Sequence, residues 1–203
     1  MKKLLLFTAS VALVQVYGSA APCTTESLSK YIALGSAGCV LGNLQVADFT
    51  YHAKASGGAA EITADQITVS PLLAPVGSYA LQFSAPWDVQ SGQDQFSAIT
   101  YHVVASSTSM PVQEVRLDGN GFKAGLFGGA VVNEALATPT ATHDLQVYEV
   151  CEEVCRSKTS ATLNLSPGAS TLVMADAVAL KSGLGSVSLT SFADWFVVCI
   201  PCV

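Results

Sequence analysis

The sequence predicts an all-β protein: an antiparallel β-sandwich, Ig-like or jelly-roll-like, with a short N-terminal helix. Three observations lead to this prediction. Apolar residues recur at every second position in many short segments, turn residues separate these segments, and no long helical pattern lies between them. Alternation of this kind is typical of strands that bury one face. Two packed sheets would bury those faces against each other.

The first twenty residues have the pattern of a secretory signal peptide. Lys2 and Lys3 precede an apolar run from Leu4 to Val16, and small residues follow up to Ala20. The run is too short to span a bilayer permanently. We therefore expect residues 1–20 to be a signal peptide and residues 21–203 to form a single exported, disulfide-bearing domain.

The mature chain is expected to begin with a helix of two or three turns. Thr25 or Ser27 would cap its N-terminus, and Gly35 would end it. The apolar residues at helical spacing are Leu28, Tyr31, Ile32 and Leu34.

After Gly35 the apolar period changes to two, which predicts a series of strands. The alternating positions are Phe49/Tyr51, Ile67/Val69, Tyr79/Leu81/Phe83, Ile99/Tyr101/Val103, Val115/Leu117, Leu145/Val147, Leu163/Leu165, Leu172/Met174 and Val187/Leu189. The segment from Asp118 to Gly121 is expected to close a hairpin. Gly125, Gly128 and Gly129 predict a bulged or strongly coiled strand after it.

Six cysteines form an even set in a chain expected to reach an oxidising compartment. Their spacing favours three local disulfides, Cys23–Cys39, Cys151–Cys155 and Cys199–Cys202, among the fifteen pairings that six cysteines allow. Two alternatives stay open. The last four cysteines could bind a structural zinc ion. Cys199-Ile200-Pro201-Cys202 also imitates a redox motif, but such a motif needs a helix N-terminus to activate its thiol.

Composition excludes several classes of partner. The chain carries a net charge of −6, and only 12% of its residues are charged. Nucleic acid and anionic membrane surfaces need clustered Lys and Arg, so neither is an expected partner. After the leader, no apolar segment approaches the roughly twenty residues of a membrane helix, so we expect no stable membrane insertion.

No catalytic motif stands out, and we predict no catalytic residue and no cofactor. His52, His102 and His143 could supply a base or a metal ligand, but outward-facing strand positions explain His52 and His102 better, and His143 is expected in a loop that leads into a strand. Asp118 and Asn120 lie in a glycine turn that resembles part of a calcium loop, so they are the weak candidates for a metal site. The later acidic ligand of that loop is missing, and turn formation accounts for both residues.

The order of several features resembles a group of exported bacterial proteins, many of which carry a C-terminal PEP-CTERM sorting tail. These features are the helix followed by Gly35 to Cys39, the strand from Gly42 to Tyr51, the Ala-Ser-Gly-Gly step before an Ile-Thr-Val-Ser-Pro strand, and the segment from Trp87 to Phe96. The resemblance implies a protein of the cell surface or extracellular matrix. The present chain lacks the tail and finishes in Cys199-Ile200-Pro201-Cys202-Val203.

Together these observations predict a secreted, non-catalytic protein with a structural or adhesive role. Its expected partners are extracellular polysaccharide or further copies of the same chain. The alternatives are a secreted hydrolase with a dispersed active site, and a module that binds calcium or a small ligand. A cleft holding a histidine or two facing carboxylates would favour the hydrolase, whereas a face carrying exposed Tyr or Trp would favour polysaccharide binding.

Overall fold

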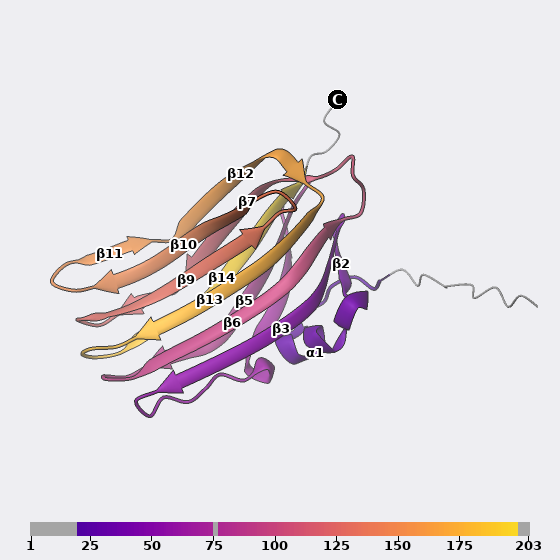
Figure 1. Ribbon diagram of the computed structural model, residues 1–203. Coiled ribbons are helices and arrows are strands. Elements are labelled where there is room, and N and C mark those ends of the chain that lie inside the picture. Colours follow the sequence, from indigo (N-terminus) through magenta and orange to yellow (C-terminus); the bar gives the residue numbers. More distant parts are fainter. Residues whose placement is uncertain (1–19, 75–76, 199–203) are drawn as a thin grey trace, which may run out of the picture.

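Two antiparallel sheets pack face to face in the computed structural model, which describes residues 20–74 and 77–198 (Figure 1). The predicted all-β sandwich is therefore confirmed. Nearly all of the expected signal peptide lies outside the described residues, as do Cys199 and Cys202. Among the described residues, no helix is long and apolar enough to cross a membrane.

The front sheet, which faces the viewer in Figure 1, has the strand order β11-β10-β9-β13-β6-β3-β2. Its strands are β2 (Cys39–Leu41), β3 (Leu44–Ser56), β6 (Asp94–Ala105), β9 (Gly128–Ala137), β10 (Thr142–Cys151), β11 (Cys155–Lys158) and β13 (Thr171–Lys181). The back sheet has the order β1-β4-β5-β14-β7-β12, with β8 paired to β14. Its strands are β1 (Glu26–Ser27), β4 (Thr68–Leu73), β5 (Ser78–Val89), β7 (Val112–Asn120), β8 (Lys123–Ala124), β12 (Ser160–Ala169) and β14 (Val187–Val198).

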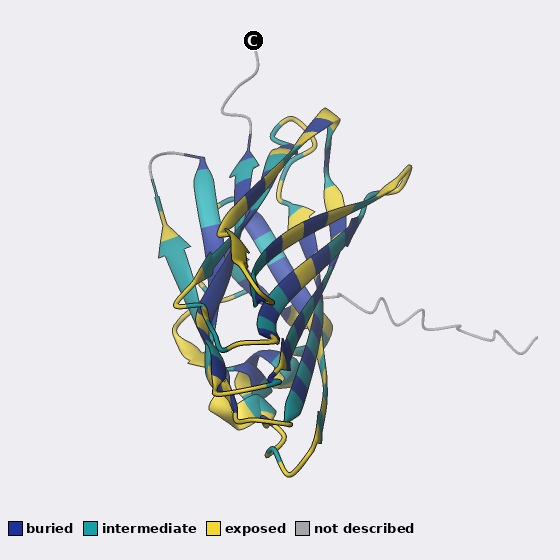
Figure 2. Ribbon diagram, turned by 90° about the vertical axis from the view of Figure 1, so that its left-hand side faces the viewer, coloured by how far each residue is buried: buried dark blue, intermediate teal, exposed yellow. Residues whose placement is uncertain are grey.

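The predicted alternation is visible as bands of buried and exposed residues along the strands (Figure 2). The inward side chains of both sheets form one hydrophobic core. A row of packed aromatic rings runs through this core, with neighbouring centroids 5.0–5.9 Å apart. In order of contact, the rings belong to Tyr31, Phe49, Tyr101, Phe83, Phe192 and Trp87.

The predicted helix is present as α1 (Leu28–Ala33), with the extended residue Ser27 at its N-cap. Leu28 is fully buried, and its amide donates to the carbonyl of Ile67 at 2.8 Å. Two short 3-10 turns, η1 (Gly35–Ala37) and η2 (Ala64–Gln66), complete the helical elements of the described residues. The Cys23–Cys39 disulfide ties the segment before α1 to β2.

The prediction that Asp118 to Gly121 closes a hairpin is wrong. Strand β7 continues through Asn120, Gly121 turns the chain with a φ of 72°, and β8 then pairs with the same neighbour, β14. The turn therefore displaces the chain along one edge of β14 and does not reverse it onto β7. The single irregular strand expected next is wrong as well: the short β8 belongs to the back sheet, and β9, which starts at Gly128, pairs in the front sheet without a register shift.

Candidate functional site

A trough crosses the outer surface of the front sheet near the β10–β11 hairpin, at the left in Figure 1. It consists of three adjoining depressions of about 610, 430 and 360 Å³. Lys181 lines the first and the second, whereas Val150 and Arg156 line the first and the third. The first depression thus adjoins both of the others, and we call the three together the front trough.

The floor of the front trough is a row of cross-strand neighbours. Phe96 of β6 lies opposite Ala179 of β13, Ala179 lies opposite Val131 of β9, and Val131 lies opposite Tyr148 of β10. Phe96 and Tyr148 are thus separated by three strand spacings, or about 14 Å. The side chains of Ala179 and Val131 between them are smaller, so the apolar floor has one aromatic side chain at each end.

The β10–β11 hairpin forms one wall of the front trough. Cys151 and Cys155 lie directly opposite each other and are joined by a disulfide, so the tip between them is held closed. At the base, a Cβ on Gly129 would come within 2.8 Å of Val150 Cγ2. A side chain at this position would therefore have to displace the Val150 side chain of the wall. The bridge also removes Cys151 and Cys155 from the zinc site considered above.

Polar and charged groups of both signs surround the apolar floor. They comprise Lys54, Asp94, Gln146, Glu152, Glu153, Arg156 and Lys181. Gln146 is held in place because its Nε2 donates to Asn133 Oδ1 at 2.6 Å. Carboxylates, amides and a guanidinium can together accept and donate hydrogen bonds to hydroxyl groups, while the aromatic faces offer apolar contact. Ligand sites commonly combine an apolar surface with a few placed polar groups in this way.

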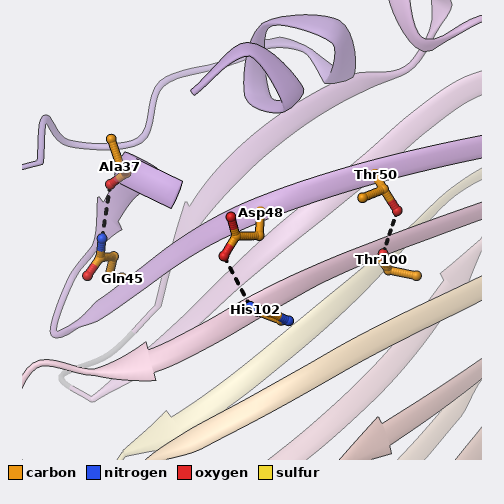
Figure 3. Close-up of polar contacts among 6 residues, drawn as sticks. All are labelled: Ala37, Gln45, Asp48, Thr50, Thr100 and His102. Carbon is orange, nitrogen blue, oxygen red and sulfur yellow. Dashed lines mark hydrogen bonds and ion pairs between the residues drawn. The ribbon is translucent and has the colours of Figure 1, made fainter. Parts of the chain in front are cut away.

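A second group of polar contacts lies on the front sheet toward the other end of β6 (Figure 3). His102 Nδ1 lies 3.1 Å from Asp48 Oδ2, and both side chains are partly exposed. Asp48 sits in a bulge of β3 with a φ of 56°, a conformation that Asp tolerates better than most residues. Beside this pair, the hydroxyls of Thr50 and Thr100 are 2.6 Å apart.

The structure keeps the three histidines apart from the front trough and from any cluster of metal ligands. His52 is exposed on β3, and His143 is half-buried near the start of β10. Neither belongs to a group of three potential metal ligands among the described residues, nor does His102.

The weak calcium candidates lie on β7 in the back sheet. Asp118 Oδ2 forms an ion pair with Arg116 Nη2 at 3.0 Å, and the same guanidinium lies 4.9 Å from the centre of the Trp195 ring. Asn120 is exposed at the end of the strand. The carboxylate of Asp118 thus has a cationic partner from the protein itself.

The most unusual ionisable groups among the described residues are three carboxyl side chains in the core. None of them was predicted as a candidate site residue. Glu134 of β9, Asp176 of β13 and Asp194 of β14 are 0–1% exposed, and each offers an oxygen within 4.8 Å of the others. We call them the acid cluster. Glu134 and Asp176 are direct cross-strand neighbours in the front sheet, and Asp194 faces them from the back sheet. The hydroxyl of Tyr101 donates to Asp194 Oδ2 at 2.5 Å.

Burial shifts the ionisation of the whole acid cluster. It raises the pKa of Glu134 and of Asp176 well above the ordinary range, and repulsion from Asp194 adds to both shifts. The pKa of Asp194 rises to about 6 through burial, although hydrogen bonds from Tyr101, Glu134 and Asp176 oppose the rise. A bulky polymer cannot reach groups so deeply buried.

The alternation of residues along the strands does contain a signal for the acid cluster. Each acid occupies an inward position between two apolar residues of the same phase, as in Val132-x-Glu134-x-Leu136 and Phe192-x-Asp194-x-Phe196. A carboxylate that interrupts a buried alternation is expensive and therefore informative.

No protein-family model and no curated protein matches the chain. Among solved structures, the chain is similar to the carbohydrate-binding module TmCBM61, solved with β-1,4-galactotriose, at a TM-score of 0.33 and 11% identity, covering 71% of this chain and 86% of that one. It is similar to the family 11 carbohydrate-binding module of a Clostridium thermocellum cellulosomal cellulase at a TM-score of 0.27 and 9% identity, covering 73% and 88%. It is also similar to the enzymatically active domain of bacteriophage CBA120 tailspike protein 4 at a TM-score of 0.30 and 11% identity, covering 78% of this chain and 19% of that one. These scores are too low to assign a function to the chain.

Proposed function

We propose that this chain is an exported, non-catalytic protein that binds extracellular polysaccharide through the front trough. Its role would be structural or adhesive, at the cell surface or in the surrounding matrix. The observation that carries the proposal is the row from Phe96 to Tyr148, an apolar floor with an aromatic side chain at each end and polar groups along both sides.

The shape of the front trough supports a polymeric ligand. It runs across several strands on an open face, so a chain could lie along it and extend beyond either end. Bases and acids both line it, including Lys181 and Glu152, so it presents no field of a single sign. A hydroxyl-rich polymer of low charge fits such a surface better than a polyanion does.

Two further observations support the exported, non-catalytic part of the proposal. Disulfides such as Cys23–Cys39 persist mainly in oxidising compartments. Glycosidases commonly place a carboxyl of raised pKa at the substrate. Here the carboxyls with raised pKa belong to the acid cluster inside the core. The resemblance to exported bacterial surface proteins suggests the same setting.

The test is a binding screen of the exported chain against soluble neutral and uronate-containing polysaccharides, followed by titration calorimetry on the best ligand. We expect Tyr148→Ala to weaken binding at least tenfold, or about 1.4 kcal/mol, because exposed aromatic anchors dominate many interfaces. Tyr148→Phe keeps the ring and should retain most of the affinity.

Trp195→Ala is the matched control, because Trp195 is a partly exposed aromatic residue on the outer surface of the back sheet. It should bind like the wild type. If Trp195→Ala abolishes binding and Tyr148→Ala does not, the front trough is the wrong site. Binding to no polysaccharide would overturn the proposed function, and release of reducing ends would replace it with hydrolysis. Association between copies of the chain stays a prediction.

A further inference from the structure

We propose that the acid cluster of Glu134, Asp176 and Asp194 binds a divalent cation, with Ca²⁺ as the ion that fits best, inside the core of the sandwich.

The geometry of the acid cluster suits an ion held by oxygen ligands. Three carboxylates converge from β9, β13 and β14, so the site would join the front sheet to the back sheet. Their facing oxygens lie within 4.8 Å of one another. Opposite ligands of a Ca²⁺ ion are separated by about twice the Ca–O distance of 2.3–2.6 Å, so the three oxygens can share one such shell. Hard oxygen ligands favour Ca²⁺, Mg²⁺ or Mn²⁺ over softer metals.

A second observation is that these buried side chains lack donors once they are ionised. With all three carboxylates charged, no described group donates to either oxygen of Glu134, to either oxygen of Asp176 or to Oδ1 of Asp194, because the hydrogen bonds among them need a carboxyl proton. An unpaired polar atom in a dry core costs on the order of 1–3 kcal/mol, and a charged group costs more. One oxygen from each of the three side chains lies within 4.8 Å of the other two, so a single cation could satisfy all three side chains.

Among residues 20–74 and 77–198, no cationic side chain is paired with the acid cluster. The ion pairs of the described residues are His102–Asp48 and Arg116–Asp118, and both involve partly exposed side chains. The groups that interact with the acid cluster are its own members and Tyr101. Like charges placed directly across a sheet destabilise it, as Glu134 and Asp176 would without an ion.

Tyr101 acts as a positioning residue in this site. Its hydroxyl donates to Asp194 Oδ2 at 2.5 Å, which leaves Oδ1 free for the ion. Hydrogen bonds of this kind orient metal ligands and commonly tune metal affinity. A 2+ ion would offset two of the three negative charges, and the Tyr101 hydroxyl would partly offset the third.

The experiment measures calcium binding and thermal unfolding of the exported chain after it has been unfolded and refolded in EDTA at pH 7.5. Extracellular calcium modules bind with dissociation constants of about 10⁻⁴ to 10⁻³ M. At 10 mM CaCl₂ the folding equilibrium constant should then rise roughly 10- to 100-fold, which raises the melting temperature by about 3–10 °C. Titration calorimetry of the chelator-treated chain with CaCl₂ should find one ion per chain, and MgCl₂ and MnCl₂ are run in parallel.

Two variants locate the site. Asp176→Asn should abolish the calcium-dependent rise in melting temperature, and Asp118→Asn, the same change on a partly exposed carboxylate of β7, should leave it unchanged. If Asp118→Asn removes the effect and Asp176→Asn keeps it, the ion binds at the β7 turn and the proposal is wrong. If wild-type chain neither binds nor is stabilised by any of the three ions, the acid cluster holds protons only, and the proposal is overturned whether or not the variants fold.

Discussion

Raising the pH in the presence of a chelator should destabilise the protein, because the core must then hold negative charge. Burial raises the pKa of Asp194 to about 6 in the folded chain. In the unfolded chain an Asp carboxyl has a pKa of about 3.9. At a pH between these two values, Asp194 is protonated in the folded chain and ionised in the unfolded chain. The free energy of unfolding therefore falls as the pH rises through this window.

The size of the loss follows from the difference between the two pKa values. They differ by about 2 units, and one pKa unit corresponds to about 1.36 kcal/mol. Ionisation of Asp194 should therefore lower the free energy of unfolding by roughly 3 kcal/mol between about pH 4 and pH 6. Glu134 and Asp176 have pKa values raised well above the ordinary range, so they extend the loss to higher pH. A typical total stability of 5–15 kcal/mol makes such a change easy to measure.

Urea unfolding in EDTA at a series of pH values, followed by tryptophan fluorescence, provides the assay. Asp194→Asn is the control, because its amide oxygen can still accept the hydrogen bond from Tyr101 but the side chain does not titrate. The stability of the wild type relative to this variant should fall steadily from pH 4 to pH 7. If that difference is flat, or grows with pH, then Asp194 ionises without penalty and the reasoning fails.

Two packing predictions use matched pairs near the N-terminal helix. Leu28→Ala should cost about 2–5 kcal/mol because the side chain is fully buried, whereas Leu34→Ala, at 42% exposed, should cost much less; equal losses in urea unfolding would contradict this. Gly38→Ala should destabilise strongly because its new Cβ would lie 2.0 Å from the carbonyl oxygen of Val46, whereas Gly35→Ala has a similar φ but meets nothing within 4 Å. Similar melting temperatures for these two glycine variants would show that Gly38 has room to relax.

Much of the fold could be predicted because its signals are local. The helix from Leu28 follows from a cap and a helical apolar spacing, and strands such as β13 follow from strict alternation. The short disulfides could be predicted from separation alone. By contrast, the direction of the chain after Asp118 depends on which strand pairs with the segment that follows the turn. In this fold β14 pairs with both β7 and β8, and this partner lies some seventy residues away in the chain.

The candidate sites were harder to predict for the same reason. The front trough gathers Phe96, Val131, Tyr148 and Ala179 from four strands, and only the sheet register places them in one row. The acid cluster likewise needs strands from both sheets. Its members did interrupt apolar alternation, so an inward carboxylate could have been recognised in each strand, but not the convergence of all three.

The position of the last two strands has a consequence for how the protein can acquire its structure. β13 lies between β9 and β6, and β14 lies between β5 and β7, so the central member of each sheet is made last. The front sheet lacks its central strand until Lys181 has been synthesised, and the back sheet lacks its central strand until Val198 has been. Such non-local pairing slows folding. The two-sheet core therefore cannot be completed before β14 is available to pair with β5 and β7.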